Sequence, residues 1–186
     1  MPSWIPCQAD TGGAPGCRIA AAAADAGVDR IDYHLVTHLH ADHLGSTPVL
    51  ATKLPILNYV DVGTPTEPNS RSAGAYEAYA GVRRNGHHIL ARAGDRIPVD
   101  GLDVQIVIAG GTALTEPLPG AGEPNPLCDG FTPLLRDESE DARSVGVVIR
   151  HGNFSMVDLG DLTWNKEHDL ACPDNLLGTV DLYLAT

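Results

Sequence analysis

The chain has 186 residues, enough for one domain with a hydrophobic core and too few for two domains of ordinary size. Apolar residues make up 43% and charged residues 19%, which excludes a disordered polyelectrolyte. The 12 basic and 24 acidic residues give a net charge of −12, so we expect no strong binding to nucleic acid.

Signals for membranes, secretion and disulfides are weak. No run of about 18 apolar residues is present, and the N-terminal MPSWIPCQADTGG lacks the regions of a secretion leader. We therefore expect no membrane contact and, by default, a cytoplasmic location. The four cysteines are scattered, and we interpret them as ordinary thiols, with one disulfide as the open alternative.

The first half of the chain alternates helix and strand patterns. We predict helices over 16–26, 43–51 and 70–84, and strands over 31–37 and 55–60. The second of these helices should stop or bend near Pro48, because proline has no backbone N–H. His87 and His88 come after the third helix, and we expect them in a solvated loop.

The second half is predicted to be mostly β. Residues 96–110 and 144–161 each have the pattern of two strands joined by a tight turn. Between them, residues 110–141 are rich in Gly, Pro and acidic residues, which predicts a long surface loop. A short helix over 163–170 and a strand over 179–186 complete an α/β pattern.

The strongest chemical signal is the segment His38-Leu39-His40-Ala41-Asp42-His43, directly after an apolar strand. Side chains two residues apart in extended chain point to the same side, so His38 and His40 can face one point. A turn into helix at Asp42 brings the next two side chains toward that point. Imidazole and carboxylate ligands together suit zinc, manganese or iron.

The segment THLHADHLG (37–45) resembles the HxHxDH signature of the metallo-β-lactamase superfamily. ADTGG (9–13) resembles the family's Asp-Thr-Gly segment, and MVDLGD (156–161) resembles its strand that ends in a metal-bridging aspartate. The resemblance implies a single metallo-β-lactamase-like domain over 1–186, an αββα sandwich. It also implies a partial domain, incomplete at both ends of the chain.

The family's metal ligands carry over to five positions. The resemblance implies that His38 and His40 bind a first ion, that Asp42 and His43 bind a second, and that Asp161 bridges the two. Zinc is the expected metal, with Mn²⁺ or Fe²⁺ as alternatives. A metal-activated water would be the nucleophile, with Asp42 and Asp161 as the catalytic carboxylates.

Other residues are expected to support these ligands. Asp10 and Thr37 would hold the ligating histidines from behind. Most family members have a further histidine before the Gly-Asp strand, and ESEDARSVG (138–146) has none. The pattern is similar to the ComEC-type DNA-uptake branch, whose Asn-x-x-Ser segment aligns with Asp141 and Ser144. Either residue could give a ligand or a supporting contact; otherwise the first metal is loosely held.

These features indicate a metal-dependent hydrolase. The ComEC-type resemblance favours a phosphodiester substrate. Two divalent ions would bring the net charge of −12 only to −8, which instead favours a small ester, lactone or amide. A non-catalytic metal-binding relic of the fold is the third hypothesis.

Overall fold

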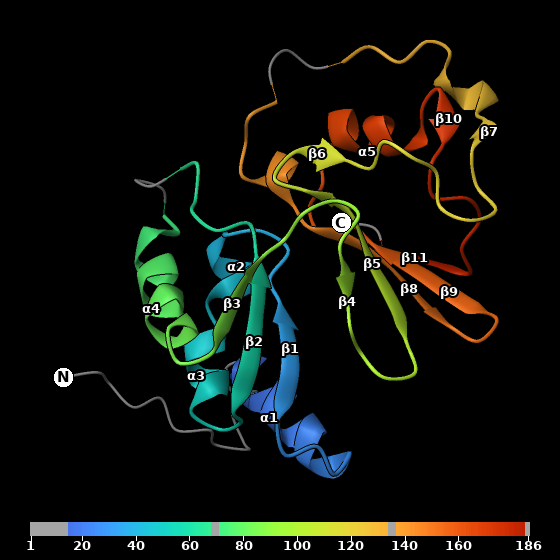
Figure 1. Cartoon of the computed structure of the whole chain (residues 1–186). Coiled ribbons are helices and arrows are strands. Elements are labelled where there is room, and N and C mark those ends of the chain that lie inside the picture. The colour runs from blue at the N-terminus through green and yellow to red at the C-terminus, as the bar shows by residue number, and fades with distance from the viewer. Residues whose placement is uncertain (1–14, 68–70, 134–136, 185–186) are drawn as a thin grey trace.

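The computed structural model describes residues 15–67, 71–133 and 137–184, which form two larger β-sheets with helices outside them and a separate two-stranded sheet (Figure 1). The helices are α1 (Pro15–Asp25), α2 (Ala41–Leu44), α3 (Thr47–Ala51), α4 (Ala73–Arg83) and α5 (Trp164–Ala171). The strands are β1 (Ile31–Leu35), β2 (Ile56–Asp61), β3 (His87–Leu90), β4 (Arg96–Ile97), β5 (Asp103–Ala109), β6 (Thr112–Ala113), β7 (Glu123–Pro124), β8 (Gly146–His151), β9 (Phe154–Asp158), β10 (Asp174–Asn175) and β11 (Leu182–Leu184).

The smaller sheet is parallel, in the order β1-β2-β3. Ile31 pairs with Ile56, and Asn58 pairs with His87. Parallel neighbours need a crossover, and here helices α2 to α4 supply it. The C-terminal ends of all three strands therefore lie at one edge, where the histidine segment follows β1.

The larger sheet has the order β11-β9-β8-β5-β4, with β6 paired to β5. Its long central strands are antiparallel, and β11 runs parallel to β9. Strand β5 is apolar on both faces: Val104 and Ile106 belong to one buried cluster, and Val107 and Ile108 to another. A register shift between Ile106 and Ile108 places the adjacent residues Val107 and Ile108 in the same cluster, which regular alternation would not allow.

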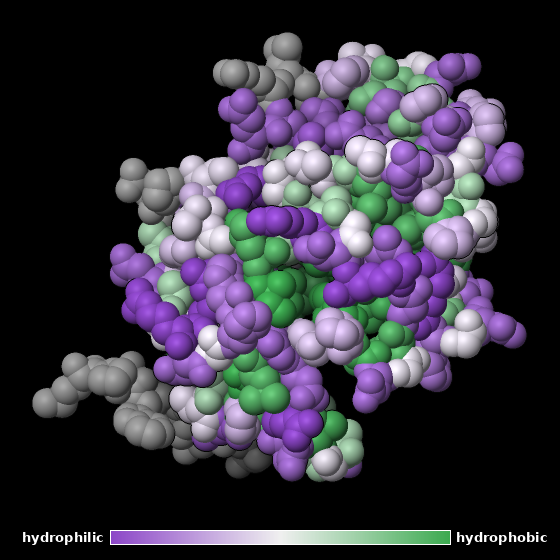
Figure 2. All heavy atoms as spheres, viewed as in Figure 1, coloured by the Kyte–Doolittle hydropathy of each residue, from purple (hydrophilic) through white to green (hydrophobic). Residues whose placement is uncertain are grey.

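Two hydrophobic clusters hold the layers together. The larger joins the small sheet and its helices to one face of the large sheet, through residues such as Tyr59, Leu50 and Val147. The smaller packs Leu170 of α5 against the other face. Figure 2 shows apolar side chains at the centre of one face of the molecule, surrounded by hydrophilic ones.

The predicted α/β sandwich is confirmed, and three local predictions are corrected. The helix predicted over 43–51 is two helices, and Pro48 lies in the first turn of α3, where its missing N–H is tolerated. His87 and His88 lie in β3, because pairing with β2 extends the sheet. Residues 110–141 include two short strands and the 3-10 turns η2 (Pro126–Cys128) and η3 (Asp141–Arg143).

Within the described ranges, no helix is long and apolar enough to cross a membrane. A disulfide joins Cys128 to Cys172, so the thiols expected there are bonded. The bridge connects the segment after β7 to the end of α5, and β7 pairs with β10 beside it. Disulfides persist mainly in oxidising compartments. A disulfide here is therefore not typical of the cytoplasmic location expected above.

Removal of this bridge should destabilise the fold. The cross-link closes a segment with a sequence separation of 44, for which loop-closure entropy gives about 4 kcal/mol. We expect Cys128→Ser/Cys172→Ser to lose about 2–4 kcal/mol of unfolding free energy in denaturant titration. Non-reducing peptide mapping of the wild type identifies the linked peptides first. Superimposable unfolding curves for the two proteins would contradict the expectation.

Candidate metal centre

The histidine segment is held at the edge where the two sheets meet. Residues 37–40 form a bend after β1, and Val145 donates its backbone N–H to the Thr37 carbonyl at 2.7 Å, which ties this bend to the approach to β8. Leu39 is buried, so its side chain anchors the segment between the two imidazoles. Helix α2 starts at Ala41 and turns the chain back.

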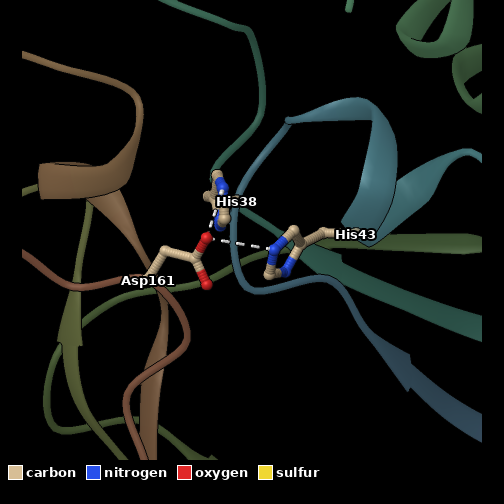
Figure 3. A group of neighbouring side chains, drawn as sticks. All are labelled: His38, His43 and Asp161. Carbon is tan, nitrogen blue, oxygen red and sulfur yellow. Dashed lines mark ion pairs between the residues drawn. The ribbon is translucent and has the colours of Figure 1, made fainter. Parts of the chain in front are cut away.

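One compact group of ligand atoms consists of His38, His43 and Asp161 (Figure 3). His43 Nε2 lies 3.3 Å from Asp161 Oδ2, and His38 Nε2 lies 4.0 Å from the same oxygen. Asp161 follows β9 through the turn at Gly160, whereas both histidines follow β1. The two sheets therefore contribute opposite sides of this group.

A second group shares His38 and adds His40 and Asp141. Asp141 Oδ1 lies 2.9 Å from His40 Nδ1 and 3.3 Å from His38 Nε2. The two ring nitrogens are 3.0 Å apart. Asp141 comes from η3, about a hundred residues after the histidines, so only the folded chain brings this carboxylate to the site.

His38 is the shared residue of the two groups, and its side chain is fully buried. Burial lowers the pKa of its imidazole, and the neighbouring rings of His43 and His40 lower it further, against the opposing effect of Asp161 and Asp141. The ring centroids of His38 and His43 are 4.0 Å apart. A neutral imidazole has a free lone pair, which is the form that binds a metal.

Thr37 lies behind the histidines. Its hydroxyl is 3.0 Å from His43 Nδ1 and 3.3 Å from His38 Nδ1, which leaves both Nε2 atoms facing the ligand groups. A Cβ on Gly160 would lie 2.6 Å from Thr37 Cβ, and Gly160 has φ of +59°. Glycine at this position therefore permits the contact that places Asp161 beside the histidines.

Glu140 is a buried residue that the sequence analysis did not single out. Its carboxylate accepts hydrogen bonds from the backbone N–H of Leu39 at 3.3 Å and of Thr66 at 2.8 Å, and from the Thr66 hydroxyl at 2.9 Å. One side chain thus fixes the histidine bend and the loop after β2. It also fixes the position of Asp141, the next residue.

The other predicted site residues have less central positions. Asp42 lies outside both groups; its carboxylate is largely exposed and 3.7 Å from His43 Nε2. Ser144 is buried under η3 and donates its backbone N–H to the Asp141 carbonyl at 2.9 Å. Asp10 lies outside the described residues. Glu67, which was not predicted, approaches His40 Nε2 at 3.7 Å.

The residues present fit a divalent metal. Among the described residues, two buried side-chain atoms have no hydrogen bond, Asp141 Oδ1 and Ser144 Oγ. Asp141 Oδ1 lies within 3.3 Å of two imidazole nitrogens without a hydrogen bond of acceptable geometry to either. A cation between these atoms would satisfy all three. Imidazole and carboxylate are ligands of first-row divalent metals.

Residues 10–128 match the sequence profile of the Metallo-beta-lactamase superfamily. This match includes the histidine segment and more than half of the chain, so the chain belongs to this superfamily. Members of the fold bind divalent metals and are generally metallo-hydrolases or related oxygenases, and the His/Asp groups described above could hold such ions.

Solved structures that are similar to this chain include two proteins with different metals. Zn²⁺-bound PqqB from Methylobacterium extorquens has 16% identity and a TM-score of 0.45, over 84% of this chain and 46% of that one. CmlA, a diiron beta-hydroxylase from Streptomyces venezuelae, has 18% identity and a TM-score of 0.39, over 83% of this chain and 25% of that one. The chain therefore spans less than half the length of either. The search of curated proteins found no match.

Substitution of Gly160 should disturb the site. Alanine at a positive φ costs about 1–2 kcal/mol, and at Gly160 its Cβ would also clash with Thr37. We expect Gly160→Ala to lose more stability than this backbone cost and to bind metal more weakly, because Asp161 is the next residue. Thermal unfolding and metal titration measure the two effects.

Gly152 provides the matched control. It has φ of +58°, but a Cβ there meets no atom within 4 Å. Gly152→Ala should therefore show the backbone cost alone and keep wild-type metal affinity. Equal effects of the two substitutions would show that the Thr37–Gly160 contact does not position Asp161.

Proposed function

We propose that this chain is a metal-dependent hydrolase of the metallo-β-lactamase type that cleaves a phosphodiester with a metal-activated water. The observation that carries the proposal is the convergence of His38 with His43 and Asp161 on one side and with His40 and Asp141 on the other. Two adjacent ligand groups with one shared histidine suit a site for one or two ions.

The residues of the histidine segment and of the turn after β9 would hold the metals. His38 and His40 would hold the first ion, Asp42 and His43 would hold the second, and Asp161 would be shared between them. When bound, the ions would lower the pKa of a coordinated water to about 7 and stabilise developing negative charge. Asp42, near the exposed edge of the site, would orient this water.

Two observations bear on the substrate. The Asp141-x-x-Ser144 segment aligns with the Asn-x-x-Ser segment of the ComEC-type branch, which supports a phosphodiester. The net charge of −12 opposes a long polyanion, so a small ester, lactone or amide is the second candidate.

Metal binding is the first test. We expect the purified chain to retain divalent metal after dialysis and His38→Ala/His40→Ala to lose most of it, because both first-ion histidines are gone. His87→Ala/His151→Ala is the matched control, since both of these histidines are exposed and far from the segment in sequence. Elemental analysis gives the metal per chain. The same content in all three proteins would contradict the ligand assignment.

Turnover is the second test. Asp161→Ala should lower the hydrolysis of bis(p-nitrophenyl) phosphate by a factor on the order of 10², since it removes both a metal bridge and charge stabilisation. Asp174→Ala, an exposed aspartate in β10, is the control and should stay near wild type. A simple lactone, assayed in parallel, decides between the two substrate classes.

Near wild-type turnover by Asp161→Ala on the better substrate would contradict the bridging role. Preference for the lactone would move the substrate to the second candidate. Metal binding without turnover of either substrate would support the third hypothesis, a non-catalytic metal-binding relic of the fold.

A further inference from the structure

Most members of the family have a further histidine before the Gly-Asp strand, which would be the third histidine ligand of the first ion. This chain has a carboxylate at that place. The sequence has no histidine between residues 138 and 146, and the structure brings Asp141 to His38 and His40 instead. The three contributing atoms, Asp141 Oδ1, His38 Nε2 and His40 Nδ1, lie between 2.9 and 3.3 Å from one another. Among the described residues, Asp141 is the only one that forms a compact ligand group with both His38 and His40.

We propose that Asp141 is a direct ligand of the first ion and that the resulting two-histidine, one-carboxylate site favours Fe²⁺ or Mn²⁺ relative to Zn²⁺. The proposal rests on metal binding by His38 and His40, as given under the proposed function. Beyond that function, the proposal names a further ligand and the class of metal that the site prefers. It does not depend on which bond the enzyme hydrolyses.

The surroundings of Asp141 fit a ligand better than an ion pair with histidine. His38 Nε2 and His40 Nδ1 lie 3.0 Å apart and both face the same carboxylate oxygen, which is the arrangement expected around one shared cation. Asp141 Oδ1 is buried and accepts no hydrogen bond, although two ring nitrogens face it. A buried carboxylate oxygen left without a partner is unfavourable, and a cation at this point removes that cost.

The position of Asp141 is fixed independently of any metal. The carboxylate of its neighbour Glu140 accepts hydrogen bonds from the backbone N–H groups of Leu39, which lies between the two histidines, and of Thr66. Arg143, at the end of η3, donates to the carbonyls of Val62 and Thr64 at 3.3 and 2.8 Å. The turn is therefore pinned on both sides of Asp141, which is the preorganisation that a metal ligand needs.

The ligand set indicates the metal class. Carboxylate is a harder ligand than imidazole and suits Mn²⁺, and two histidines with one carboxylate are the ligands of non-haem Fe(II) sites. Zinc binds more tightly than manganese to most sites of either kind, so the informative quantity is the ratio of affinities. Exchange of Asp141 for histidine should shift that ratio toward zinc.

The experiment compares the wild type with Asp141→Asn, Asp141→His and the controls Asp174→Asn and Asp174→His. Mn²⁺ binding is followed by the loss of the free-ion EPR signal, and Zn²⁺ binding by competition against the bound Mn²⁺. Fe²⁺ is titrated without oxygen as a second probe. Circular dichroism checks the fold of each variant, and the partly exposed side chain of Asp141 leaves room for imidazole.

We expect Asp141→Asn to weaken Mn²⁺ binding at least tenfold and Asp141→His to raise the preference for Zn²⁺ over Mn²⁺ at least tenfold. Both Asp174 variants should match the wild type. Unchanged Mn²⁺ affinity in Asp141→Asn would overturn the proposal, as would a wild type that binds neither ion. If Asp141→His fails to fold, Asp141→Asn still decides whether Asp141 is a ligand.

These outcomes are separate from the test of hydrolysis. Loss of Mn²⁺ in Asp141→Asn together with no turnover by the wild type would support the ligand and reject the hydrolase. Metal-dependent turnover with unchanged metal affinity in Asp141→Asn would reject the ligand and leave the hydrolase in place.

Discussion

The buried imidazole of His38 is the constraint on which the rest of the site depends. It is fully enclosed and lies against two other imidazoles and two carboxylates, with the Thr37 hydroxyl behind it. Asp141 Oδ1 faces two of the ring nitrogens without a hydrogen bond, which is unfavourable for a buried oxygen. Leu39 is buried in the larger hydrophobic cluster and holds the bend after β1 in this position. A cation bound between Asp141 Oδ1 and the facing ring nitrogens would satisfy that oxygen.

Buried carboxylates hold the surrounding loops from behind. The carboxylate of Glu140 links the histidine bend to Thr66 through hydrogen bonds. At the end of β2, Asp61 is fully buried and accepts hydrogen bonds from Tyr79, Arg83 and His88, at 2.5 to 2.8 Å. It also accepts the Gly63 N–H at 2.6 Å. Acidic side chains thus hold the loop after β2 at its start, through Asp61, and at Thr66, through Glu140, so part of the chain's acidity is structural and not a solvated surface.

The local part of this site could be predicted from the sequence, and the distant part could not. The ligand spacing of His38, His40 and His43 depends on one strand and one turn, which periodicity describes well. Asp141 was recognised only as an aligned position with two open roles, because its contact with His40 spans about a hundred residues. The sequence did not indicate the roles of Glu140 and His88. An isolated glutamate or histidine is typical of a surface position, and only the tertiary structure shows the groups with which it pairs. Helix and strand types were mostly predictable, whereas the break between α2 and α3 depended on packing.

The charge of the centre bears on the substrate that it would accept. Two divalent ions supply four positive charges, and Asp42, Asp141 and Asp161 together supply three negative ones, so the occupied site would carry a net charge of about +1. A histidine in place of Asp141 would give about +2. A single positive charge suffices for one phosphodiester group, which is a monoanion. It does not offset the remaining acidity of the chain along a polymer, whose further phosphates would meet a surface of negative sign. If the substrate is a phosphodiester, the electrostatics of this chain therefore favour a small one over a long nucleic-acid strand.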